Sequence, residues 1–281
     1  MLDVLAGLIL CSVLLYVFGK LSELEYPSEG YMFTVYPWLT TAPETITTTI
    51  YALRGYYVTA IANSVYSATF DMFAAFGLAT LIHGDNDVKV TDLGVIAALS
   101  ACLFLLLDFD GGITRLDGYL LYGVLVASMV YSLARYGFPR IRPDPWTVFR
   151  VVIGLAGLGI VSFYLAFFVE ALIPYLGEFL AGIISAALTS LPDLVVSIIY
   201  GITSSYSQAQ ILGCIAHDFI ENVATAAIIA GLILDAAPAI TFGIVGVTVA
   251  ALLFSLSYGR VTRFEAVLII IAYIVASLLI I

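Results

Sequence analysis

The amino-acid sequence predicts an all-α integral membrane protein with about ten transmembrane helices, arranged as two inverted repeats of five helices each. Of its 281 residues, 62% are hydrophobic and 11% are charged, whereas soluble domains are about half apolar and about a quarter charged. Apolar segments near the length of a membrane-spanning helix follow one another along the whole chain. A hexapeptide with a proline and an acid occurs once in each half, which indicates an internal repeat.

The apolar segments are joined by short polar connections, so no soluble domain is expected between them. The net charge is −10 and no basic cluster is present, so nucleic acid is not an expected partner. The expected surroundings are the lipid bilayer, with the protein as a monomer or a weak homo-oligomer. The ten predicted spans are residues 2–19, 31–53, 56–82, 93–108, 116–136, 147–173, 177–200, 208–234, 238–257 and 263–281.

The positions of Lys and Arg predict the topology. Ten spans leave two basic residues, Arg54 and Arg115, on one side of the membrane and all the others on the opposite side. Because basic residues favour the cytoplasmic side, both termini are expected outside, in a multi-pass protein of the cell membrane. The basic residues on the cytoplasmic side are Lys20, Lys89, Arg135, Arg140, Arg142, Arg150, Arg260 and Arg263.

The repeated hexapeptides lie at residues 39–44 and 188–193, each with the order Leu, Thr, hydroxyl, aliphatic, Pro, acid. Proline breaks a helix in its interior, so the second and seventh helices are predicted to be broken. Five helices are an odd number, so the second copy of the repeat must be inverted, as in many secondary transporters. The predicted units are residues 1–136, a cytoplasmic linker at 137–146, and 147–281.

Four acidic residues lie deep within apolar segments that contain no basic residue, and they are Glu44, Asp71, Asp193 and Glu221. Each costs about 2.5–3.5 kcal/mol to place in a bilayer, so a bound cation or protons must offset their charge. Hydroxyl residues at four-residue spacing share a helix face with these acids. Such oxygen donors suit Ca²⁺ or Na⁺ better than zinc or copper.

Other classes of protein fit the sequence less well. An intramembrane enzyme would need a Gly-x-Gly-Asp or a His-Glu-x-x-His motif, and the sequence contains neither. Neither enzyme activity nor a cofactor is therefore expected, while a passive cation channel or a transport-inactive membrane subunit stays open as an alternative. Three cysteines lie in apolar segments and are interpreted as small core residues instead of a metal-binding set: Cys11, Cys102 and Cys214.

Residues 40–44 and 189–193 resemble the G-T-S-x-P-E signature in the α-repeats of the calcium/cation antiporter superfamily, the sodium/calcium exchangers. The resemblance extends over nearly the whole chain, although Leu39 and Leu188 replace the signature glycine. It implies alternating-access exchange of a divalent cation, Ca²⁺ first, against Na⁺ or H⁺, with the first and sixth helices sliding across the rest. The implied metal ligands are Glu44, Asp193, Asp71, Glu221, Thr40 and Thr189.

The helix after each signature carries a G-N-x-x-G-S-N-x-x-[ND] pattern in this superfamily, which Asn63, Ser67 and Asp71 match in part. The second half matches more loosely, because His217 and Asp218 stand where hydroxyls would help hold Na⁺. Histidine titrates near neutrality, so H⁺ is an alternative to Na⁺ as the counter-ion. The residues implied for a secondary ion or proton site are Thr41, Ser190, Asn63, Ser67, His217 and Asp218.

Overall fold

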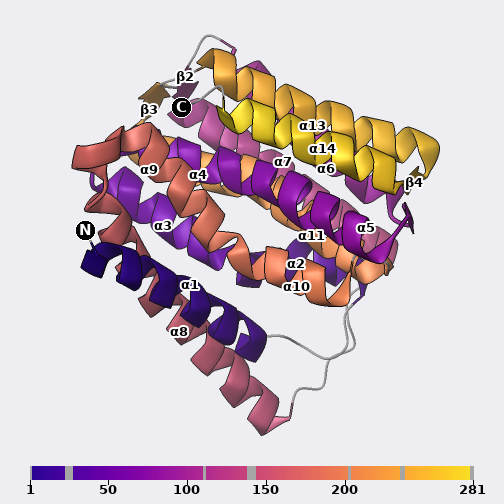
Figure 1. Ribbon diagram of the computed structural model, residues 1–281, viewed down its shortest axis with the longest axis horizontal. Coiled ribbons are helices and arrows are strands. Elements are labelled where there is room, and N and C mark those ends of the chain that lie inside the picture. Colours follow the sequence, from indigo (N-terminus) through magenta and orange to yellow (C-terminus); the bar gives the residue numbers. More distant parts are fainter. Residues whose placement is uncertain are drawn as a thin grey trace.

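The computed structural model describes residues 2–22, 28–109, 112–137, 144–201, 204–234 and 238–278, which form long helices without a closed sheet (Figure 1). The all-α fold predicted from the sequence is confirmed. Arg140, Arg142 and most of the predicted 137–146 linker lie outside the described residues. The helices are α1 (Leu2–Ser22), α2 (Glu29–Thr40), α3 (Ala42–Leu53), α4 (Tyr57–Phe70), α5 (Gly77–His83), α6 (Thr91–Leu107), α7 (Arg115–Tyr136), α8 (Pro145–Glu170), α9 (Ile173–Thr189), α10 (Leu191–Tyr200), α11 (Ser205–His217), α12 (Val223–Ala230), α13 (Pro238–Tyr258) and α14 (Arg263–Leu278).

Both repeated hexapeptides interrupt a helix. Thr41 separates α2 from α3, and Ser190 separates α9 from α10. Pro43 and Pro192 lie in the first turn of α3 and of α10. A proline is favoured there because the first N–H groups of a helix have no intrahelical acceptor. Each hexapeptide therefore ends one helix and begins another in the middle of an apolar segment.

The helices that follow the breaks contain π-helical segments. The segment η1 (Asp71–Phe76) joins α4 to α5, and η2 (Asp218–Asn222) joins α11 to α12. Each π segment begins with an aspartate, and both aspartates are buried. Short π segments within α-helices are frequent at functional sites. The two aspartates are therefore candidate functional residues.

Broken helices of one half pack against π-containing helices of the other half at glycines. A Cβ on Gly213 of α11 would lie 2.5 Å from the carbonyl oxygen of Phe33 and from Cγ of Pro37 in α2. A Cβ on Gly182 of α9 would lie 2.6 Å from Cβ of Ala62 in α4. Only glycine permits backbones to approach so closely, and these two crossings bring the helix breaks to the centre of the molecule.

Two short antiparallel strand pairs also join the halves. The strand β1 (Asn86–Asp87) pairs with β4 (Arg260–Val261), and β2 (Gly112–Thr114) pairs with β3 (Leu232–Leu234). The strands β2 and β4 lead into α7 and α14. Each pair satisfies backbone groups where the chain turns between helices, and each pair links an early segment to a late one.

The outer surface is apolar, as expected of a membrane protein. Figure 1 shows α1 and α8 side by side along one edge and α13 and α14 along the opposite edge. Three further apolar helices among the described residues are shorter, with 10–17 residues. The chain is a multi-pass membrane protein, and the count of ten spans stays a prediction. The helices of the described chain that are long and apolar enough to span a bilayer number five: Asp3–Leu21, Tyr57–His83, Arg115–Tyr136, Pro145–Glu170 and Ser207–Ala230.

Candidate cation-binding site

The two helix breaks bring an acid from each half to the centre. Glu44 and Asp193 are buried, with 1% and 4% of their surface exposed, and they lie close enough for their charges to repel each other. The Ser190 hydroxyl donates a hydrogen bond of 3.1 Å to Oε1 of Glu44, so one break contacts the signature acid of the other. Gln210 donates a 3.3 Å hydrogen bond to Oδ1 of Asp193.

The first residues of the two π segments lie beside this pair. Asp71 is near both Glu44 and Asp193, and Asp218 is near the same two acids and near Asp71. Four buried acids therefore come together, two from each half, on helical segments that contain no Lys or Arg. Such a cluster is unstable in a bilayer unless a cation or protons offset its charge.

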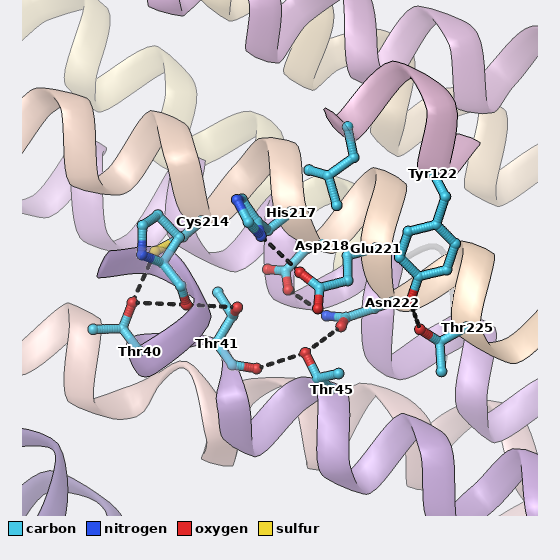
Figure 2. Close-up of polar contacts among 12 residues, drawn as sticks. Thr40, Thr41, Thr45, Tyr122, Cys214, His217, Asp218, Glu221, Asn222 and Thr225 are labelled. Carbon is cyan, nitrogen blue, oxygen red and sulfur yellow. Dashed lines mark hydrogen bonds and ion pairs between the residues drawn. The ribbon is translucent and has the colours of Figure 1, made fainter. Parts of the chain in front are cut away.

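Glu221, the expected counterpart of Asp71, lies beside Asp218 and contacts His217 (Figure 2). Its Oε2 contacts Nδ1 of His217 at 2.7 Å, and its side chain is 13% exposed. The His217 ring meets Trp38 edge-on, with the ring centroids 6.2 Å apart. Asp218, which was expected at a secondary site, is the second-half acid that lies near Glu44, Asp71 and Asp193. The chain is two residues shorter between signature acid and π segment in the second half than in the first.

A hydrogen-bond chain connects Asp218 to the first broken helix, as Figure 2 shows. Asn222 donates to Oδ1 of Asp218 at 2.6 Å, and its own Oδ1 accepts from the Thr45 hydroxyl at 2.7 Å. The amide therefore fixes the orientation of one oxygen of Asp218. The other oxygen, Oδ2, has no hydrogen-bond partner within the described part of the chain.

Several other buried oxygens of the site also lack a hydrogen-bond partner within the described part of the chain. Among the described residues, no hydrogen bond reaches Oε2 of Glu44, Oδ1 of Asp71, Oδ1 of Asn63 or the Ser67 hydroxyl, although all are buried. Buried polar groups without partners cost stability. Their convergence from both halves makes them the groups best placed to bind an ion.

The threonines expected at the site bond within their own helices. The Thr41 hydroxyl donates to the Pro37 carbonyl at 2.7 Å, and that of Thr189 to the Ser185 carbonyl at 3.1 Å. The Thr40 hydroxyl oxygen lies 3.3 Å from Sγ of Cys214. The Thr189 side chain also hydrogen-bonds Glu44, so it contacts both its own helix and the signature acid of the other half.

Asn63 joins the first broken helix to the helix after it. Its Nδ2 donates to the Thr48 hydroxyl at 2.9 Å and to the Glu44 carbonyl at 3.3 Å. The amide is therefore oriented by α3, while its Oδ1 stays available for a ligand.

Cys214 belongs to the central group, although the sequence analysis interpreted it as a core residue. Its Sγ and one carboxylate oxygen each of Asp71 and Asp193 all lie within 4.8 Å of one another. A spacing in the sequence indicates this position. Cys214 precedes Asp218 by four residues, as Ser67 precedes Asp71.

A narrow cavity leads toward the site from one side of the protein. It is lined by Thr40, Pro192 and Asp193, extends past Tyr36, and reaches Lys20 at the end of α1. The cavity has room for about one water molecule.

Comparison with known proteins agrees with this architecture. Residues 4–134 match the sequence model of the family described as "Sodium/calcium exchanger protein". A structure of the sodium-calcium exchanger NCX_Mj soaked with 10 mM Na⁺ and 10 mM Sr²⁺ is 16% identical, with a TM-score of 0.77 over 98% of each chain. The same exchanger soaked without Na⁺ and Ca²⁺ is 18% identical, with a TM-score of 0.76 over all of both chains. No curated protein sequence matches the chain.

The breaks, the paired π segments and the shared architecture define a multi-pass membrane protein with the fold of a cation exchanger. Residues 4–134 are similar in sequence to the sodium/calcium exchanger family, and the whole chain shares the fold of NCX_Mj. Both findings support the resemblance to the calcium/cation antiporter superfamily that the two hexapeptides carry.

Proposed function

We propose that the protein is a secondary-active antiporter that exchanges a divalent cation, with Ca²⁺ as the first candidate, for Na⁺ or H⁺. The observation that carries the proposal is the convergence of Glu44, Asp71, Asp193 and Asp218 in a buried group without a basic residue on their helical segments. Carboxylates with carbonyl and amide oxygens are the donors that Ca²⁺ prefers. The sodium/calcium exchanger family match supports the same class of cargo.

In this proposal Glu44 and Asp193 bridge the divalent ion, and Asp71 and Asp218 complete its charge balance. Carbonyl groups at Thr40 and Thr189 next to the helix breaks add further oxygen ligands. Asn63 and Ser67 supply groups for the counter-ion, and the His217–Glu221 pair lies at the edge of the site. No catalytic step is required, so the protein acts as a transporter and not as an enzyme.

Alternating access would come from motion of α1 and α8 across the remaining helices. These two helices pack chiefly on each other, along one edge of the molecule (Figure 1). The cavity past Lys20 lies between α1 and the broken helices, so sliding of α1 would open or close it. Two inverted five-helix units, residues 1–136 and 147–281, with both termini outside the cell membrane, complete the proposal.

The proposal is tested by uptake of radioactive Ca²⁺ into proteoliposomes. A Na⁺ gradient and a pH gradient are imposed separately, and uptake is expected only when one of them is present. Glu44→Gln and Asp193→Asn are each expected to reduce uptake to background, because each removes a charged ligand. Glu178→Gln is the matched control, since the described contact of Glu178 uses its backbone carbonyl.

A passive cation channel would carry Ca²⁺ without any counter-ion gradient, and a transport-inactive subunit would carry none under either gradient. Full uptake by both site variants would contradict the proposed site. Size-exclusion chromatography in detergent checks that each variant is folded and monodisperse.

A further inference from the structure

A thiol lies among the buried carboxylates of the proposed site. Cys214 is fully buried, and its Sγ lies within 4.8 Å of carboxylate oxygens of both Asp71 and Asp193. We propose that Cys214 is a ligand of the transported ion and shifts the preference of the site from Ca²⁺ toward divalent d-block ions of the Zn²⁺ and Cd²⁺ class. The inference rests on the divalent-cation function proposed above and narrows its substrate class.

The position of Cys214 is fixed by the packing around it. The preceding residue, Gly213, brings α11 against the backbone of α2 at Phe33. The Cys214 sulfur lies 3.3 Å from the hydroxyl of Thr40, at the end of α2 (Figure 2). The thiol is therefore held at the helix break, facing the acids and not the lipid.

An independent observation points to ligand binding at the same place. Oδ1 of Asp71 is buried and has no hydrogen-bond partner in the part of the chain that the structure describes. Zinc binds thiolate sulfur at about 2.3 Å and carboxylate oxygen at about 2.0–2.2 Å. An ion between Asp71, Asp193 and Cys214 would reach all three donors with only small side-chain movements, given their mutual distances below 4.8 Å.

The chemistry of the donor atoms determines which ion this arrangement binds most strongly. Ca²⁺ takes 6–8 ligands and binds through oxygen, so a sulfur atom in its coordination shell fills a position without contributing a good ligand. Thiolates select softer ions such as zinc. Two carboxylates with one thiol form a mixed set that suits borderline and soft divalent ions.

The two halves of the protein differ at this point. Ser67 precedes Asp71 by four residues in the first half, and Cys214 precedes Asp218 by four in the second. The Ser67 hydroxyl is buried without a described partner. The first half thus offers a hydroxyl and the second a thiol at matching places, so a Ser at position 214 is the natural oxygen counterpart.

The test is a Cd²⁺ titration of the purified full-length protein in detergent, followed by ultraviolet absorption. A Cys11→Ser/Cys102→Ser variant serves as the background, because both residues lie outside the central group. Bound Cd²⁺ is expected to give a sulfur-to-metal charge-transfer band in this background, and Cys214→Ser is expected to abolish it. Displacement of radioactive Ca²⁺ by Cd²⁺ and by Zn²⁺ gives the relative affinities.

Cys214→Ser is expected to lower the Cd²⁺-to-Ca²⁺ affinity ratio at least about tenfold, and Ser67→Cys is expected to raise it. Absence of the band in the background variant, or an unchanged affinity ratio in Cys214→Ser, would overturn the inference. The band does not depend on transport. A protein that shows it but carries no ion under any gradient would keep the ligand assignment and refute the antiporter proposal alone.

Discussion

Replacing Gly213 with alanine tests whether the close crossing of α11 and α2 supports both the fold and the site. The added Cβ would lie 2.5 Å from the Phe33 carbonyl oxygen and 2.9 Å from its Cα, so backbone and not a flexible side chain must move. Overpacking costs about 1–3 kcal/mol, and rigid backbone neighbours favour the upper value. Alanine in place of glycine returns about 1 kcal/mol of helix propensity, which leaves a net loss near 2 kcal/mol.

For a chain of this size, about 2 kcal/mol corresponds to a fall in melting temperature of roughly 4–8 °C. The assay is thermal unfolding of the detergent-solubilised protein, monitored by Trp fluorescence, together with Ca²⁺ binding. Binding is expected to weaken as well, because displacement of α11 moves Gln210 away from Asp193, whose carboxylate it helps to orient.

Gly123→Ala is the matched control for this variant. Gly123 lies inside α7, and no heavy atom comes within 4 Å of an added Cβ. It should therefore keep or slightly raise the melting temperature, through helix propensity alone. Equal melting temperatures for the two variants would refute the close-packing argument, and an unchanged ion affinity in Gly213→Ala would refute its link to the site.

Two further predictions concern the ends of α8. The Arg54 guanidinium bonds to Glu170, whose side chain is only 12% exposed, so Arg54→Gln is expected to destabilise the protein by about 1–3 kcal/mol. Adding Glu170→Gln should restore most of the melting temperature, and failure to do so would argue against the pair. Thr147 donates backbone and side-chain hydrogen bonds to Asp144, which lowers the pKa of that exposed carboxyl. The resulting stabilisation exists above the ordinary pKa of aspartate and disappears as the pH falls through the lowered value, so Asp144→Ala should flatten the melting temperature profile below about pH 4.

The architecture could be predicted from the sequence because its causes are local. Apolar segment length and the prolines within them determine where helices exist and where they break. The breaks fall at Thr41 and Ser190, within the two repeated hexapeptides. The crossings at Gly182 and Gly213 depend on contacts between distant segments, so sequence pattern alone does not identify these glycines among the 23 in the chain.

The site could be predicted only in part, for a reason that lies in helix geometry. Sequence offsets equated Glu221 with Asp71, whereas the structure places Asp218 at the matching start of a π segment. A π segment adds a residue to a helical turn and changes which side chains share a face. The four-residue spacing from Asp218 back to Cys214 matches that from Asp71 back to Ser67, because each pair spans the last α-helical turn and the first residue of the π segment.

The features that maintain the fold are separate from the donors of the proposed site. The chain shares only 16–18% of its residues with NCX_Mj, yet the TM-scores are 0.76–0.77. Apolar surfaces, prolines and close glycine crossings maintain the arrangement of helices. These features do not depend on which donor atoms lie at its centre. The thiol of Cys214, where the first half has the hydroxyl of Ser67, alters ligand softness while leaving those features intact. Ion preference can therefore change by substitution at a few positions beside the breaks, and the donors of each half must be considered separately.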